Sequence, residues 1–349
     1  MEGPGSATAA AQLAMLDAMK HCPCGACGPL LGHAAAKQEE LCIDAAVDLY
    51  RRATSEQPKC VAALNGLADC LLSMGDKEAA LEALRRSVEL APKGLPERYM
   101  NLGQLSEGAD ALRWLEAGVA ILREEWQAAS QKSAGKGSKH KGSSYGSGSS
   151  GGGGNGQAVE AAHALASALC SVAEVYLTDA CDEPEAEEKC ESAATEAMSL
   201  IAPLAEEQRI AEPYVTMASL RLSQQRGDEA CAVLSEGLRL LKEADEANPP
   251  SFDLRLSCAK LLMEVEQPAE AVELLQALRL EHDDHLEAWY LLGCAAMQAG
   301  DASFALHEAE AACAFATSDA CPLEEREWLA QLEELREEAA AAAEGEMPE

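Results

Sequence analysis

The feature that most constrains this chain is a helical pattern that returns every 34 residues. Four positions recur at that distance, with Ala46, Tyr50, Ala53 and Pro58 followed by Ala80, Leu84, Ser87 and Pro92. The spacings of three and four within each set place its members on one side of a helix. A 34-residue period is typical of a two-helix unit that stacks on its neighbours into an α-solenoid. The pattern therefore predicts an extended binding surface rather than an enclosed catalytic cavity.

Two units show the pattern clearly. Leu64 precedes Ala80 by 16 residues, with Asp76 in the turn between two helices, and Trp289 precedes Ala305 by the same distance. This is the layout of the tetratricopeptide repeat. With the more degenerate units included, we count about seven helix pairs, the terminal ones irregular. The predicted fold class is all-α, a tetratricopeptide-repeat α-solenoid with a C-terminal capping helix after Pro322.

The pattern divides the chain into five segments. We expect a disordered Ala-, Gly- and Cys-rich leader over 1–33, N-terminal repeats over 34–129, a basic Gly/Ser insertion over 130–156, C-terminal repeats over 157–317, and a capping helix with an acidic tail over 318–349. The insertion carries four dispersed lysines and no acidic residue. Its Gly- and Ser-rich composition predicts a disordered segment.

The charge of the chain restricts its partners. Sixty acidic and 27 basic residues give a formal net charge of −33. A field of this sign repels nucleic acid, whose phosphates require Lys and Arg, and it attracts basic ligands. We therefore predict a basic partner and no direct contact with nucleic acid. Solubility alone is the alternative explanation of the charge.

The 14 cysteines are predicted to be reduced thiols packed in helices. The N-terminus lacks the basic start and apolar core of a secretory signal, and no apolar run approaches the length that spans a membrane. The segment from His21 to Cys27, which includes Cys22 and Cys24, and His33 beyond it offer ligand types for zinc. Paired CxxC knuckles are absent, so we predict a cysteine-rich loop and no metal.

No motif in the chain indicates catalysis. Phosphate-binding loops that end in Gly-Lys-Ser or Gly-Lys-Thr do not occur, and the glycine run at 151–154 lacks the strand and helix that such a loop needs. The histidines His163, His282, His285 and His307 are scattered. We therefore expect no enzyme activity and no cofactor.

The partner-binding residues are expected on the first helix of each pair, which lines the inner side of such a stack. Carboxylates dominate these positions, with Met and Tyr between them. The candidates are Asp69, Glu97, Met100, Glu107, Glu174, Glu212, Asp253, Met263, Glu264, Glu287, Tyr290 and Met297. Carboxylates bind Lys and Arg, and methionines adapt to apolar side chains, so the complementary ligand is a long basic peptide with apolar residues. Simple solvent exposure of these charges is the alternative.

Three stretches resemble one family in particular. They are RYMNLGQLSEGADALRWLEAGVAIL from Arg98, ASLRLSQQRGDEA from Ala218, and PSFDLRLSCAKLLMEVEQPAEAVELL from Pro250 with EAWYLLG from Glu287. The shortened helix that ends in GQLSEG at Gly108 is foreign to the general repeat, so it is the most specific feature. Over most of 40–317 the chain is similar to the tetratricopeptide-repeat assembly chaperones of large-subunit ribosomal protein L-four. The insertion and the cysteine cluster depart from that family's pattern.

The resemblance implies a dedicated chaperone. Such a protein would capture the newly made ribosomal protein by its long basic loop, keep it soluble, and deliver it for 60S pre-ribosome assembly. The implied compartments are cytoplasm and nucleus, and we expect a monomer when the chaperone is free. A generic repeat scaffold in a multiprotein complex remains the alternative.

Overall fold

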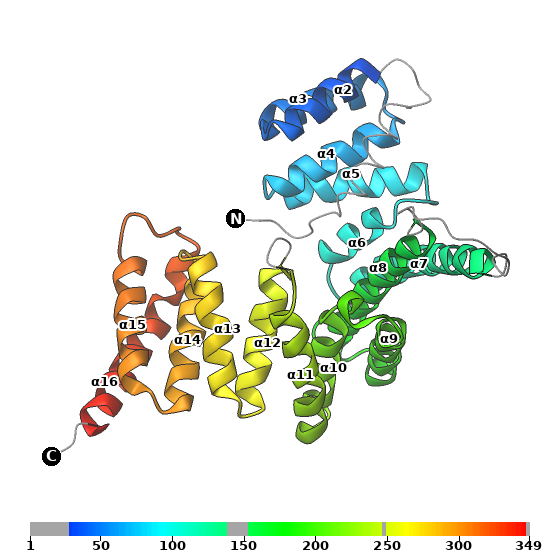
Figure 1. Ribbon diagram of the computed structural model, residues 1–349. Coiled ribbons are helices and arrows are strands. Elements are labelled where there is room, and N and C mark those ends of the chain that lie inside the picture. Colours follow the sequence, from blue (N-terminus) through cyan, green and yellow to red (C-terminus); the bar gives the residue numbers. More distant parts are fainter. Residues whose placement is uncertain (1–27, 138–152, 246–248, 347–349) are drawn as a thin grey trace, which may run out of the picture. The chain divides into compact units, whose positions relative to one another are not determined.

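The computed structural model describes residues 28–137, 153–245 and 249–346 (Figure 1). Within these ranges the chain forms fifteen α-helices and no β-strand. The chain divides into two compact units, Met1–Lys189 and Cys190–Glu349, and each is described by itself. The predicted site candidates His21, Cys22, Cys24 and Cys27 lie outside the described residues, whereas His33 is exposed on the first described helix.

The helices follow each other as pairs. Unit 1 contains α2 (Gly28–Glu39), α3 (Ile43–Glu56), α4 (Val61–Ser73), α5 (Lys77–Leu90), α6 (Glu97–Gln104), α7 (Gly108–Gly137), α8 (Gly153–Leu177) and the start of α9 (Ala186–Ile201). Unit 2 continues with α10 (Glu212–Ser223), α11 (Gly227–Lys242), α12 (Phe252–Glu264), α13 (Pro268–Glu281), α14 (Leu286–Ala299), α15 (Ala302–Ala316) and α16 (Leu329–Glu346). Contacts join α2 with α3, α4 with α5, α6 with α7, α10 with α11, α12 with α13 and α14 with α15, and α16 follows the last pair. The predicted α-solenoid is confirmed.

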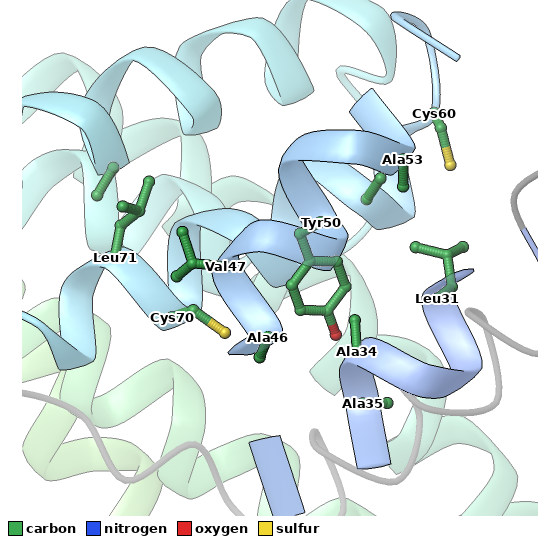
Figure 2. Close-up of a cluster of buried hydrophobic side chains, with 12 residues drawn as sticks. Leu31, Ala34, Ala35, Ala46, Val47, Tyr50, Ala53, Cys60, Cys70 and Leu71 are labelled. Carbon is green, nitrogen blue, oxygen red and sulfur yellow. The ribbon is translucent and has the colours of Figure 1, made fainter. Parts of the chain in front are cut away.

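The 34-residue pattern corresponds to the buried side of each second helix. Ala46, Tyr50 and Ala53 of α3 are fully buried, and so is Ala80 of α5. Figure 2 shows Tyr50 among small side chains of its own helix and of α2, where Ala34 lies beside its ring. Because alanine has so little volume, the paired helices approach closely. The periodic alanines of the sequence are therefore packing contacts.

The turns within pairs use conventional helix caps. Gly75 adopts a left-handed φ of 76°, and the carboxylate of Asp76 accepts a hydrogen bond from the backbone N–H of Ala79 at 3.2 Å. The last pair repeats this arrangement, because Asp301 accepts from the N–H of Phe304 at 3.0 Å. Such caps stabilise the helix start that follows each turn. They fix the point at which the second helix of the pair begins.

The third pair departs from the others as the GQLSEG motif predicts. Helix α6 has only eight residues, whereas its partner α7 has 30. The two helices pack closely through glycine: a Cβ added at Gly103 would lie 2.4 Å from Cγ of Leu115, and one at Gly118 would lie 2.9 Å from Sδ of Met100. The later turns of α7 therefore extend past the beginning of α6.

Two predicted boundaries differ from the observed helices. Helix α2 begins at Gly28, inside the predicted leader 1–33, and α7 and α8 both enter the predicted insertion 130–156. Extending an existing helix costs less than starting a new one, so α7 continues to Gly137 despite the polar sequence. The center of the insertion lies outside the described residues.

One expectation is corrected in unit 1. The segment Gly156–Leu177 of α8 has the length and apolar composition of a membrane span, although the sequence was expected to contain none. Its side chains Leu165, Ala166 and Ala173 are fully buried in the described repeats. A core helix that is rich in alanine can match a membrane span in length and apolar composition.

The C-terminal helix caps unit 2. Leu332 of α16 is fully buried, and Leu335 contacts α14 so closely that a Cβ at Gly293 would lie 2.6 Å from its Cδ2. Just before α16, the carboxylate of Glu325 accepts a hydrogen bond from the N–H of Leu286 at 2.8 Å, at the start of α14. The predicted capping helix thus covers the last repeat.

Candidate partner-binding surface

The first helices of consecutive pairs contact each other within each unit. Helix α2 contacts α4 in unit 1, and α10 contacts α12, which contacts α14, in unit 2. Helices α4 and α6 share a buried cluster that contains Ala68 and Leu102. We call the side of each unit formed by these helices the first-helix face. All twelve predicted residues lie on first helices except Glu107, which is in the loop before α7.

Unit 1 brings three carboxylates together on this face. Asp69 of α4 is half-buried, and burial, with the negative charge of Glu97 added, raises its pKa to about 7. Burial and the same charge of Glu97 raise the pKa of Glu125 on α7. Because charges act over short distances, Glu97 lies within electrostatic range of each of the other two carboxylates. We call Asp69, Glu97 and Glu125 the acidic cluster.

No carboxylate of the acidic cluster forms an ion pair in the described part of the chain, although the charge of Glu97 acts on the neighbouring Arg98. None of the three forms a side-chain hydrogen bond there either. Arg98 is next to Glu97 in sequence, but its guanidinium turns inward and donates to backbone carbonyls, including that of Ala91 at 2.8 Å. The cluster therefore presents three carboxylates without an ion pair, of which Asp69 is half-buried and Glu97 and Glu125 are exposed.

Sequence reasoning missed Glu125 because it lies on a second helix. The signal was the shortened helix before Gly108, since a short α6 leaves the later turns of α7 free to reach the first-helix face. Met100, which was predicted, is half-buried and packs against Gly118 of α7. The remaining unit 1 candidates, Glu107 and Glu174, are exposed.

One predicted carboxylate on the first-helix face of unit 2 is already paired with a cation. Glu287 of α14 accepts from Nζ of Lys260 of α12 at 2.6 Å, so its charge is already compensated. Asp253 and Glu264 of α12 are exposed, whereas Glu212 of α10 and Met263 of α12 are half-buried. Unit 2 therefore offers fewer uncompensated carboxylates than the sequence indicated.

Two predicted residues of α14 are covered from the C-terminal side. The ring of Tyr290 lies 5.5 Å from that of Trp328, centroid to centroid. Met297 packs against a buried cluster that includes Ala339 of α16. A capping helix occupies the position that a further repeat would take, so it contacts the exposed side of α14. We leave Tyr290 and Met297 out of the proposed surface.

The described cysteines behave as packing residues. Seven of these eleven are buried, and within the described residues all eleven are free thiols. Burial raises the pKa of Cys70 to about 12 and that of Cys258 to about 12, which disfavours the reactive thiolate. No group of three or more metal-ligand side chains occurs among the described residues.

Helix pairs with alanine-packed second helices and a capping helix define a tetratricopeptide-repeat protein. Family models described as tetratricopeptide repeat match residues 30–94 and 221–294. A solved structure titled "Assembly Chaperone of RpL4 (Acl4) (Residues 1-338)" is 30% identical, with a TM-score of 0.65, over 79% of this chain and 97% of that chain. The chain belongs to this family of assembly chaperones.

Two relatives carry the name "Probable assembly chaperone of rpl4". The protein of Emericella nidulans is 32% identical over 266 residues, which are 72% of this chain and 59% of that protein. The protein of Schizosaccharomyces pombe is 32% identical over 221 residues, 62% of this chain and 56% of that protein. The chain thus spans less than two thirds of the length of these relatives.

Proposed function

We propose that this protein binds a newly made RpL4, the ribosomal protein named in its relatives' titles, through a long basic segment of that client. The observation that carries the proposal is the acidic cluster, in which Glu97 interacts with Asp69 and with Glu125 and none of the three forms an ion pair in the described residues. A Lys or Arg of the client would supply the missing charge. Charge-assisted hydrogen bonds of this kind are stronger than neutral ones.

The position of the cluster makes such binding selective. Asp69 is half-buried, so an incoming cation is partly desolvated and interacts through a lower effective dielectric than at an open surface. The side chain of Met100 is next to this region and offers an apolar contact for neighbouring client residues. The surface thus fits a segment in which basic and apolar residues are mixed.

Binding alone accounts for the proposed activity. A bound basic segment is shielded from aggregation and from premature contact with RNA. Because ribosomal RNA carries a far higher charge density than the protein, it can compete for the segment at the pre-ribosome. The proposal therefore includes transport between cytoplasm and nucleus and release during 60S assembly, without nucleotide hydrolysis.

The direct test is co-expression of this protein with RpL4 and with RpL4 that lacks its basic loop. We expect the intact client to co-purify in a stoichiometric complex and the loopless client to be lost or to aggregate. Equal recovery of both clients would contradict capture by the basic loop. An unrelated stable partner in place of the client would favour the scaffold alternative.

We predict that Glu97→Gln combined with Glu125→Gln weakens client binding about tenfold, because each change removes one uncompensated carboxylate from the acidic cluster. Isothermal titration at 150 mM salt measures the affinity. The matched control is Glu273→Gln combined with Glu287→Gln, whose carboxylates already pair with Lys242 and Lys260, each at 2.6 Å. An equal loss in both variants would show that only net charge matters, against a role for this cluster.

A further inference from the structure

The outward sides of α3 and α5 carry the same basic residues at the same repeat positions. Arg51 and Arg52 of α3 are followed 34 residues later by Arg85 and Arg86 of α5. The lysines that follow the two helices, Lys59 and Lys93, have the same spacing. All six side chains are exposed. We call them the repeat basic patch.

The repeat geometry places the six residues on one surface. Helix α3 buries Ala46, Tyr50 and Ala53. Helix α5 buries the residues at the equivalent repeat positions. The arginine pairs lie on the opposite side of each helix. Stacked repeats present equivalent positions to the same side of the stack. The patch therefore continues across two repeats, and it lies on second helices rather than on the first-helix face.

The charges of the repeat basic patch are unpaired within the described part of the chain. Among the described residues, none of the six forms an ion pair. Unit 2 behaves differently, because eight of its ten Lys and Arg residues pair with carboxylates. These eight are Arg209, Arg221, Arg226, Arg239, Lys242, Arg255, Lys260 and Arg279. Unpaired cations are thus more frequent in the first repeats than in unit 2.

The charge of this region also differs from that of the chain. Residues 43–96 contain seven basic and eight acidic residues, a formal charge of −1, whereas the whole chain carries −33. The pattern ends at the third pair. Because α6 is short, buried Ala111 and Leu115 follow Ala80 and Leu84 by 31 residues, so the positions equivalent to Arg85, Arg86 and Lys93 are Glu116, Ala117 and Glu124. The patch is therefore bounded, and an anionic ligand meets little local repulsion there.

We propose that the repeat basic patch binds an acidic segment of another protein. An arginine fork binds a carboxylate bidentately. The surface also holds two exposed acids, Asp48 and Glu82, one turn before the arginine pairs. A continuous phosphate backbone would be repelled by them, whereas separate carboxylates of a peptide can contact the arginines and avoid them. This site has the opposite charge preference to the acidic cluster and does not depend on it.

The test uses the full-length protein and a fluorescein-labelled polyglutamate peptide of about 16 residues, followed by anisotropy at 50 and 150 mM salt, where salt screens exposed charges increasingly. We expect Arg85→Gln with Arg86→Gln to weaken binding at least fivefold. The control Arg226→Gln with Lys242→Gln makes the same charge change at ion-paired sites, and we expect less than a twofold effect. Circular dichroism confirms that both variants are folded.

Three results would overturn the proposal. The first is that the peptide fails to bind the wild-type protein, and the second is that both double variants lose affinity equally. The third is that poly(U) RNA of the same length binds the patch more tightly than the peptide. A further variant, Arg85→Lys with Arg86→Lys, keeps the charge and removes the guanidinium fork. We expect it to bind between the wild type and the glutamine variant, and binding equal to wild type would contradict recognition by the fork.

Discussion

Replacing Asp69 with asparagine is expected to stabilise the protein by about 2 kcal/mol at pH 8 while weakening client capture. Burial raises the pKa of this carboxyl from an ordinary value of 3.8 to about 7, and Glu97 adds to the rise. At 1.36 kcal/mol per pKa unit, the ionised folded state would be disfavoured by about 4 kcal/mol. Because Asp69 is only half-buried, solvent screening reduces this figure to about half.

The pH dependence has a definite sign. Below pH 3.8 the carboxyl is protonated in both the folded and the unfolded state, so it costs nothing. Between pH 3.8 and about 7 only the folded state keeps the proton, and folding stability from this group falls as the pH rises. Urea unfolding of wild type and Asp69→Asn at pH 4 and pH 8 measures it. The two proteins should have equal stability at pH 4 and differ at pH 8.

A matched control separates this effect from the general loss of negative charge. Asp48 is exposed on α3, and Asp48→Asn removes the same charge. Exposed substitutions of this kind usually change stability by less than about 0.5 kcal/mol. A gain for Asp48→Asn as large as that for Asp69→Asn would assign the effect to net charge. A gain in stability for Asp69→Asn without loss of affinity would remove Asp69 from the proposed binding surface.

Burial of the Asp69 carboxylate explains why Asp69→Asn should raise the stability of the fold and lower the affinity for the client. A carboxylate that costs folding energy in the free protein recovers that energy when a cation arrives, because the pair compensates the charge. Client binding should therefore release a proton from Asp69 near neutral pH. Natural proteins commonly keep binding-site residues that lower the stability of the fold.

The sequence predicted the repeat stack well because the pattern is local. Ala46 and Ala80 are fully buried, as their helical spacing predicts, since that spacing decides which side of a helix packs. The candidate surface was harder to predict. Glu125 joins it because α7 extends past a short α6, and Tyr290 leaves it because Trp328 packs on its ring. Both outcomes depend on contacts between segments, which repeat spacing does not encode.

The repeat pattern also did not predict the buried polar residues. Ser87 occupies the position that Ala53 holds one repeat earlier, and both are fully buried. A hydroxyl in the core needs partners, and Ser87 donates to Oδ1 of Asn65 on α4 and accepts from Nη1 of Arg98 on α6 at 3.1 Å. This network is specific to the second and third pairs, so a general repeat consensus gives no sign of it.

Arg98→Met is expected to destabilise unit 1 by about 1 to 3 kcal/mol, since the change leaves buried carbonyl oxygens without their hydrogen-bond donor. The Arg98 side chain is only 4% exposed. Its guanidinium donates to the carbonyl oxygens of Ser87 at 3.2 Å, Ala91 at 2.8 Å and Gly94 at 2.6 Å. These carbonyls belong to the end of α5 and the loop before α6, so Arg98 fixes the connection between the second and third pairs.

The free energy of unfolding, measured in denaturant for Arg98→Met and for Arg86→Met, checks this prediction. Arg86 is an exposed residue of α5. Arg86→Met should change stability by less than about 0.5 kcal/mol, as exposed substitutions usually do. Arg98→Lys should fall between them, because it keeps the charge but cannot reach several carbonyls at once. If Arg98→Met unfolds like Arg86→Met, the carbonyl contacts do not stabilise the link. Because α6 also carries Glu97, a loosened link should weaken client capture at temperatures where the protein is still folded.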